Sequence, residues 1–181
     1  MSDERSDGQV VSAVLEGESD DFRVLVDRYE DTLYRHLCRM AGDETLAAEL
    51  LQKTFIRSYR RLDQCRKPER VGGWMFRIAS NLYKDHMKSR ARDDVALEDA
   101  PPLQAEGENP ESAAERGEVR VQLEEALQAL TPEKREAFLL KHLEEYTYAE
   151  ISERLGVSAS AAKMRVHRAR EELQEILEDT P

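Results

Sequence analysis

The stretch Tyr146-Thr147-Tyr148-Ala149-Glu150-Ile151-Ser152-Glu153-Arg154-Leu155-Gly156-Val157-Ser158 predicts two helices joined by a tight turn. Thr147 and Glu150 have the spacing of a capping box, in which each side chain satisfies an amide at the start of a helix. Ala149, Ile151 and Leu155 are expected to face inward on the first helix. Gly156 allows the turn, and Ser158 is a favoured cap for the helix that follows. This order of signals is typical of a helix-turn-helix motif.

The second helix of this motif, expected over residues 159–177, has one apolar face and one basic face. The apolar positions recur at helical spacing and are expected to face the core: Ala162, Val166, Ala169 and Leu173. The opposite face carries Lys163, Met164, His167, Arg168 and Arg170. Because a recognition helix enters the major groove, where Lys and Arg reach phosphates and base edges, we favour DNA binding. A plain helical hairpin is the alternative.

Charge is distributed unevenly along the chain of 181 residues, whose net charge is −11. Residues 53–92 hold 12 basic and 3 acidic residues, whereas residues 93–118 hold 1 basic and 9 acidic residues. Residues 163–170 hold 4 basic residues and no acidic residue. Two basic blocks in an acidic chain indicate localised anion-binding surfaces, although solvated helix faces give the same pattern.

Several classes of protein are excluded by the composition. No apolar run approaches the roughly 20 residues of a membrane helix, and the N-terminus does not resemble a signal peptide. Cys38 and Cys65 do not make a disulfide framework, so we expect a cytoplasmic protein with free thiols. Catalytic motifs, cofactor loops and metal-ligand spacings are not found, so we expect no enzymatic activity, no cofactor and no metal.

The rest of the chain, with 8 Gly and 6 Pro, predicts an all-α fold. Apolar periodicity predicts helices over residues 9–16, from Phe22 to a stop at Gly42, over 44–62 and from Trp74 to the basic residues before 93. Asp20 or Asp21 would cap the second of these, and residues 63–73 would form a loop. Thr131 and Pro132 predict another helix start. The acidic, Pro- and Gly-containing segment 93–118 is expected to be a flexible linker between two domains, 1–92 and 119–181.

Two blocks of sequence resemble bacterial extracytoplasmic-function sigma factors. Glu49-Leu50-Leu51-Gln52-Lys53-Thr54-Phe55 and Trp74-Met75-Phe76-Arg77-Ile78-Ala79-Ser80-Asn81-Leu82 are similar to their region two. Leu130-Thr131-Pro132-Glu133 and Lys163-Met164-Arg165-Val166-His167-Arg168-Ala169-Arg170 are similar to their region four. The resemblance implies a protein that binds core RNA polymerase and directs transcription initiation, while the polymerase performs the chemistry. It also implies an anti-sigma partner.

The resemblance assigns three sets of residues. Region two would grip the β′ clamp helices through Glu49, Leu50, Gln52, Lys53 and Arg57. Region two would also open and read the minus-ten promoter element through Cys65, Arg66, Lys67, Arg70, Val71, Arg77, Asn81 and Lys84. Region four would touch the β flap and read the minus-thirty-five element through Ser158, Ser160, Lys163, Met164, Arg165, His167, Arg168 and Arg170.

The chain departs from the family pattern at four of these positions. The family usually has an acid at the position of Lys53 and often has aromatic residues near Cys65 and Val71, so we expect weaker base stacking here. Met164 replaces a small polar residue and is expected to contact a thymine methyl.

Other readings stay open at this point. The acidic linker either threads the polymerase channels or is a solubilising tether, and in the free protein it would shield the basic block 53–92. A dimeric helix-turn-helix regulator that acts without polymerase is the second hypothesis for the function. A helical adaptor that binds proteins only is the third.

Overall fold

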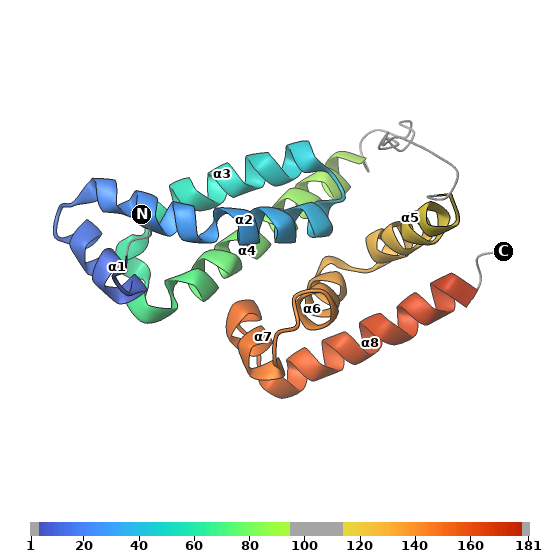
Figure 1. Cartoon of the computed structure of the whole chain (residues 1–181). Helices are drawn as coiled ribbons and strands as arrows, with labels where there is room; N and C mark the ends of the chain where they lie inside the picture. Colours follow the sequence, from blue (N-terminus) through green and yellow to red (C-terminus); the bar gives the residue numbers. More distant parts are fainter. Residues whose placement is uncertain (1–3, 95–113, 179–181) are drawn as a thin grey trace.

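The computed structural model describes residues 4–94 and 114–178, which form eight α-helices with no strand among them (Figure 1). This confirms the all-α prediction for the described residues. The helices are α1 Asp7–Leu15, α2 Phe22–Ala41, α3 Glu44–Arg60, α4 Val71–Asp94, α5 Ala114–Ala129, α6 Pro132–His142, α7 Tyr148–Leu155 and α8 Ala159–Glu178. In the same residues no helix is both long and apolar enough to cross a bilayer.

Local signals explain where most of these helices begin and end. Gly42 has a left-handed backbone (φ 65°) and ends α2 as predicted, and the Asp43 side chain accepts a hydrogen bond from the Leu46 amide at the start of α3. Asp21 stands at the N-cap position of α2, as predicted, but its side chain makes no capping hydrogen bond. A 3-10 turn, Ser19–Asp21, leads into the helix, and the Asp21 carboxylate pairs with Arg5 instead.

The starts of α4 and α5 also differ from the sequence predictions, whereas α6 begins at Pro132 as predicted. Helix α4 begins at Val71, so Gly72 and Gly73 lie in its first turn and not in a loop. Thr131 precedes Pro132 at the start of α6, but its side chain makes no capping hydrogen bond. Helices α4 and α5 extend into the segment predicted to be a linker, and residues 95–113 of that segment lie outside the described residues.

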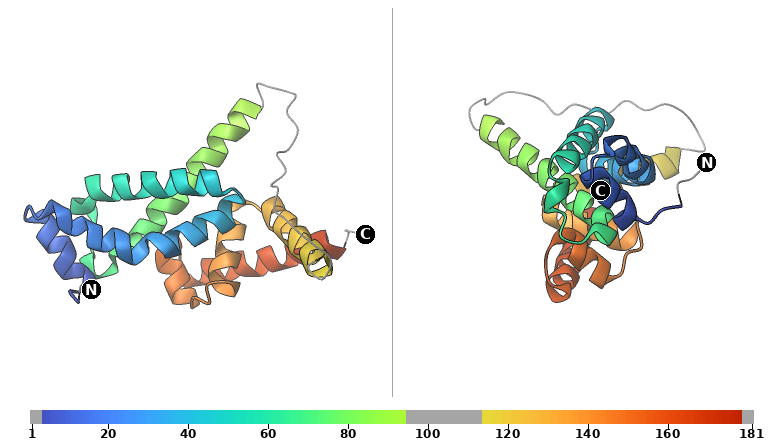
Figure 2. Two further views of the ribbon diagram at one scale, coloured as in Figure 1. Left: turned by 45° about the horizontal axis from the view of Figure 1, so that its top comes forward. Right: turned by 90° about the vertical axis from the view of Figure 1, so that its left-hand side faces the viewer.

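Two helical groups pack against each other. Helices α2, α3 and α4 lie side by side with α1 at one end (Figures 1 and 2). In the other group α6 lies against α2 and α7 lies against α4, while α8 packs on α5, α6 and α7. The C-terminal part of α4 extends beyond this bundle in both views of Figure 2. Buried side chains from both groups, such as Leu37 and Met40 of α2 and Leu139 of α6, belong to one continuous core. The two DNA-reading regions implied by the sequence are therefore in contact.

Candidate nucleic-acid interfaces

The helix-turn-helix has the local structure that its sequence predicts. The Thr147 hydroxyl accepts from the Glu150 amide, while the Glu150 carboxylate accepts from the Thr147 amide at 2.8 Å. Gly156 adopts a left-handed backbone (φ 68°), and the Ser158 hydroxyl accepts from the Ala161 amide at 3.1 Å. Buried Leu140, Ile151 and Ala162 hold α6, α7 and α8 together. Ala149 was expected to face inward, but it is exposed.

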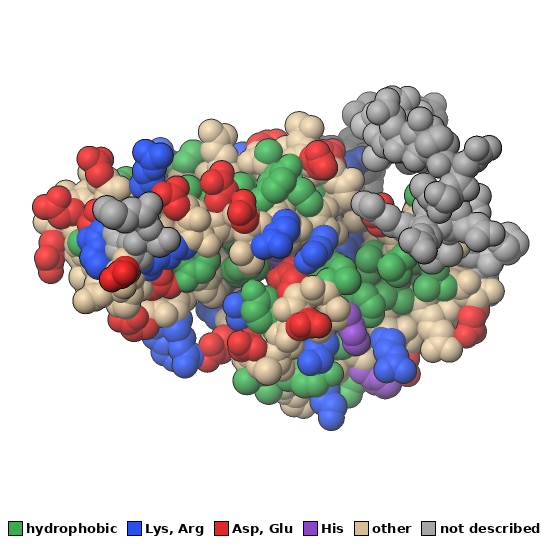
Figure 3. Space-filling view, viewed as in Figure 1, with side chains coloured by type: hydrophobic (Ala, Val, Ile, Leu, Met, Phe, Trp, Pro, Cys, Tyr) green, Lys and Arg blue, Asp and Glu red, His purple; other side chains and the backbone are tan. Residues whose placement is uncertain are grey.

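The exposed face of α8 carries the residues predicted for minus-thirty-five recognition. Met164 is 48% exposed, and positions 160, 163, 164, 167 and 168 follow one stripe at helical spacing. In the view of Figure 3, basic and histidine side chains gather on the molecular surface over α6 and α8. The exposed members of the predicted set are Ser158, Ser160, Lys163, Met164, His167, Arg168 and Arg170, and Arg165 is half-buried. The major groove of B-DNA admits an α-helix, so such a stripe can face the base edges there.

A second basic surface lies on residues 65–70 and the adjoining face of α4. Arg66, Lys67, Arg70, Arg77 and Asn81 are exposed there. The side chains of two other predicted contacts do not reach this surface. Val71 is fully buried, and Cys65 is buried with its thiol near the Lys67 carbonyl, where burial raises the pKa of the thiol. Both side chains belong to the core beneath the loop, so the structure does not support the prediction that they contact DNA directly.

Helices α6 and α7 cover part of this second basic surface. The Glu153 carboxylate pairs with Arg70, and its backbone carbonyl accepts from the Arg77 guanidinium at 2.5 Å. Lys84 lies mostly buried, with its ammonium 2.8 Å from the buried carboxylate of Glu136. Three of the residues predicted to meet the minus-ten element are therefore engaged by acidic residues of the other helical group, and the sequence did not predict this contact.

Buried polar side chains hold the two groups together. Arg135 of α6 is only 2% exposed, and its guanidinium donates to the Leu127 carbonyl at 2.7 Å and to the Tyr83 hydroxyl of α4 at 2.6 Å. Burial lowers the pKa of Arg135 and raises that of Tyr83. Such a buried cation is tolerated because carbonyl oxygens satisfy its donors, and this fixes where α6 sits against α4.

His36 of α2 completes this junction. Its Nδ1 lies 2.8 Å from the Glu144 carboxylate, and its Nε2 lies 3.9 Å from the Glu136 carboxylate. Ser80 of α4 also donates a hydrogen bond to Glu136. Two carboxylates from the second group therefore meet His36, Ser80 and Lys84 of the first.

The helix predicted to contact polymerase, α3, presents a mixed polar and apolar face. Glu49 and Lys53 are exposed and form an ion pair, whose lysine lowers the pKa of Glu49. Gln52 is exposed and Arg57 is half-buried, but Leu50 is buried, so its side chain is a core residue and is not at the surface. Ile56 and Tyr59, both 46% exposed, extend the same face. Neither residue was among the predicted polymerase contacts, although both lie at helical spacing from Gln52 (i+4 and i+7).

Comparisons with known proteins cover both helical groups. Residues 25–93 match the family model "Sigma-70 region 2", and residues 120–173 match "Sigma-70, region 4". The chain is 36% identical over 155 residues to the ECF RNA polymerase sigma factor SigE of Mycolicibacterium smegmatis, covering 84% of this chain and 60% of that protein's length. It is 30% identical over 178 residues to SigW of Bacillus subtilis, covering 93% of this chain and 95% of that protein.

Two solved structures share the fold. CnrH in complex with the cytosolic domain of CnrY superimposes with a TM-score of 0.69 at 24% identity, covering 98% of this chain and 100% of that one. The sigma factor RpoE in complex with the anti-sigma factor NepR from Bartonella quintana gives a TM-score of 0.64 at 21% identity, covering 89% and 99%. At these sequence identities the two structures show that the fold is shared and nothing further.

Proposed function

Because this chain belongs to the extracytoplasmic-function RNA polymerase sigma factors, we propose that it binds core RNA polymerase and directs promoter-specific initiation of transcription. The observation that carries the proposal is the presence of two separate basic surfaces on one chain, each within a segment that matches a sigma region. The chain contributes recognition, and the polymerase contributes the catalysis. Its place of action is the cytoplasm, with an anti-sigma factor as the controlling partner.

Recognition of the minus-thirty-five element is assigned to α8. Lys163, His167 and Arg168 face the major groove with Met164, where lysine and arginine donate to guanine edges and the thioether meets a thymine methyl. Arg165 and Arg170 bind phosphates. Ser158 and Ser160 add phosphate contacts at the N-terminus of α8, whose amides favour anions.

Recognition of the minus-ten element is assigned to residues 65–70 and α4. A melted strand is read by turning a base out of the stack, and the Asn81 amide offers a donor and an acceptor to its edge. Arg66, Lys67, Arg70, Arg77 and Lys84 neutralise the phosphates around that base. Because Arg70, Arg77 and Lys84 contact α6 and α7 in this structure, these helices must move away before the surface is complete.

The contact with polymerase is assigned to the exposed face of α3, meeting the β′ clamp helices. Exposed Ile56 and Tyr59 supply the apolar centre, and Glu49, Gln52, Lys53 and Arg57 supply a polar rim. Region four meets the β flap. The alternative of a dimeric regulator that acts without polymerase does not account for the match of residues 25–93 to region two.

Run-off transcription with purified core polymerase tests the proposal. The template is the DNA upstream of the gene for this protein, and two variants, Asn81→Ala and Arg168→Ala, remove one proposed reader each. We expect a discrete transcript that either substitution abolishes, whereas Arg35→Ala, an exposed arginine of α2 outside both surfaces, leaves it unchanged. Failure to bind core polymerase in a parallel pull-down would overturn the proposal in favour of the stand-alone regulator.

A further inference from the structure

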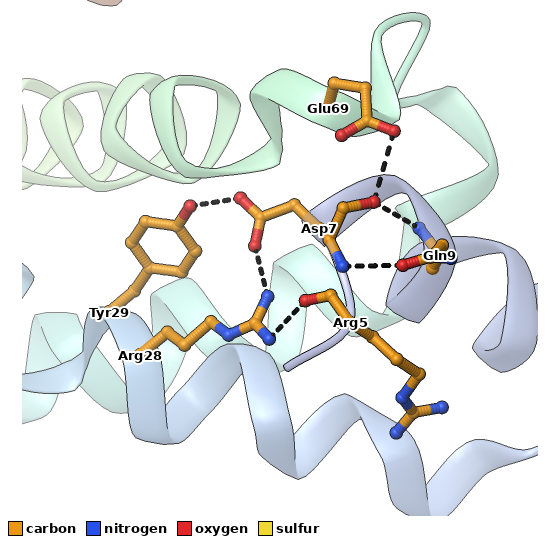
Figure 4. A network of polar contacts seen from close by, with 7 residues as sticks. Arg5, Asp7, Gln9, Arg28, Tyr29 and Glu69 are labelled. Carbon is orange, nitrogen blue, oxygen red and sulfur yellow. Dashed lines mark hydrogen bonds and ion pairs between the residues drawn. The ribbon is translucent and has the colours of Figure 1, made fainter. Parts of the chain in front are cut away.

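A network of polar contacts joins the N-terminal helix α1 to α2 and to Glu69, in the 3-10 turn that precedes α4 (Figure 4). The Asp7 carboxylate accepts hydrogen bonds from the Tyr29 hydroxyl and, at 2.8 Å, from the Arg28 guanidinium, and both donors lie on α2. Arg28 also donates to the Arg5 carbonyl at 2.5 Å. Burial and the adjacent Asp7 carboxylate raise the pKa of Tyr29, so its hydroxyl stays protonated and keeps donating.

Tyr29 lies directly against the first turn of α4. A Cβ atom added at Gly72 would be 2.4 Å from Cε1 and 2.7 Å from the hydroxyl oxygen of Tyr29, so only glycine allows this approach. The ring therefore sets the position of the backbone at Gly72. Because α4 begins at Val71, immediately after the loop 65–70, the same contact also fixes where that loop ends.

The other side of the loop rests on α1. The Glu69 carboxylate lies over the first turn of α1, 3.4 Å from the Ser6 hydroxyl and so close to Gly8 that a Cβ there would overlap it. Helix α1 begins with a capping box formed by Ser6 and Gln9, so the place where Glu69 rests is itself ordered. The single acid of the loop is thus turned toward α1, while Arg66, Lys67 and Arg70 face outward.

We propose that Asp7 and Tyr29 are positioning residues for minus-ten recognition. They hold α1 and the start of α4 in one geometry, so that the loop between them presents its basic side chains and Asn81 to the DNA in a fixed register. Base reading requires such precision, since a recognition group displaced by about an ångström loses its hydrogen bonds. The inference rests on the proposed function and adds residues that do not themselves touch DNA.

The test measures base preference separately from affinity. Holoenzyme is incubated with a single-stranded DNA library of random sequence, and the bound strands are sequenced. Tyr29→Phe keeps the ring against Gly72 and removes only the hydroxyl, and Asp7→Asn weakens the acceptor. For both variants we expect the preference for the best base over the others to fall about fivefold, the effect of about one hydrogen bond. Binding to core polymerase should be unchanged.

The matched control is Tyr34→Phe, which removes the hydroxyl of another half-buried tyrosine of α2 whose partner is Cys38. It should keep the base preference of the unmodified protein. The inference is overturned if Tyr29→Phe and Asp7→Asn enrich the same sequence as strongly as the unmodified holoenzyme. It is also overturned if Tyr34→Phe lowers the base preference by the same factor as those two variants. If the unmodified holoenzyme enriches no sequence, the proposed minus-ten function fails, and that result is distinguishable from either outcome.

Discussion

Met164 is the residue that should distinguish α8 most clearly from a recognition helix that contacts bases through polar side chains alone. It is 48% exposed between Lys163 and His167 on the outer face of α8. If its thioether packs on a thymine methyl, replacing that thymine by uracil removes one methyl contact and should weaken binding about fourfold, from about 0.8 kcal/mol per buried carbon. The measurement is holoenzyme affinity for minus-thirty-five duplexes with uracil substituted at one position at a time.

In the Met164→Ala variant the same uracil substitutions should have no effect, because the contacting group is absent. Equal sensitivity of both proteins to uracil would assign the methyl contact to another residue. Comparing both proteins on both DNAs isolates the contact between Met164 and the thymine methyl, since any general loss of affinity in the Met164→Ala variant cancels.

Ile56 tests the apolar centre of the proposed polymerase contact. Its side chain is 46% exposed on α3, and a buried apolar anchor at the centre of an interface carries much of the binding energy. Ile56→Ser should weaken binding to core polymerase about tenfold in a titration with labelled sigma factor, corresponding to about 1.4 kcal/mol. Leu15→Ser, at a 53% exposed leucine of α1, is the matched control. Equal affinities for the two variants would exclude Ile56 from the interface.

At the scale of the element, the capping box of α7 orders the helix-turn-helix. Thr147→Ala removes the side-chain acceptor for the Glu150 amide, and we expect a loss of about 1 kcal/mol in the free energy of unfolding. Urea titration followed by circular dichroism measures it, with Thr45→Ala on the exposed surface of α3 as the control. A loss no larger than that of the control would mean that packing alone fixes the start of α7.

The same cap predicts a pH dependence. Hydrogen bonds from Thr147 lower the pKa of Glu150 below its usual 4.5 in the folded protein. The ionised carboxylate therefore stabilises the fold above the unfolded-state pKa, and this contribution is lost as the pH falls through the lowered folded-state value. The difference in unfolding free energy between the unmodified protein and Glu150→Gln should be constant near neutral pH and vanish in acid. A difference that persists in acid would contradict the assignment.

Elements with local signals were predictable from the sequence, and elements set by distant contacts were not. The capping box, the left-handed turn at Gly156 and the end of α2 at Gly42 each depend on residues within a few positions of one another. The start of α4 did not follow its sequence, because Gly72 serves the approach of Tyr29 and does not break the helix. Burial of Cys65 and Val71 likewise depends on packing that a single segment does not reveal.

At the scale of the whole molecule, the contact between the two helical groups was the largest feature that the sequence did not reveal. The prediction was that the acidic linker 93–118 shields the basic block, and residues 95–113 lie outside the described residues. In the structure, Glu136 and Glu153 of α6 and α7 occupy part of that basic surface. Charge counts along the sequence do not show whether the linker or the helices α6 and α7 shield the basic block, because both are acidic segments downstream of it.

Glu136 gives the sharpest test of this docking. Its buried carboxylate accepts from Ser80 and lies 2.8 Å from the Lys84 ammonium and 3.9 Å from His36 Nε2. Glu136→Ala would remove the carboxylate beside the Lys84 ammonium and leave His36 Nε2 facing a gap, a cost that separation of the groups relieves. We therefore expect free Glu136→Ala protein to bind single-stranded minus-ten DNA more tightly than the unmodified protein, up to about tenfold for each 1.4 kcal/mol of docking energy lost.

Two comparisons decide what this result means. Glu133→Ala, a half-buried glutamate of the same helix, should leave DNA affinity unchanged, which separates loss of docking from a mere change in net charge. Neutralising Asp93, Asp94, Glu98 and Asp99 tests the linker independently, measured by fluorescence anisotropy at low salt. If Glu136→Ala separates the two groups in solution scattering but does not raise DNA affinity, docking does not control access. If only the linker variant raises DNA affinity, the linker is what shields the basic block, and the contacts of Glu136 serve to hold the fold together.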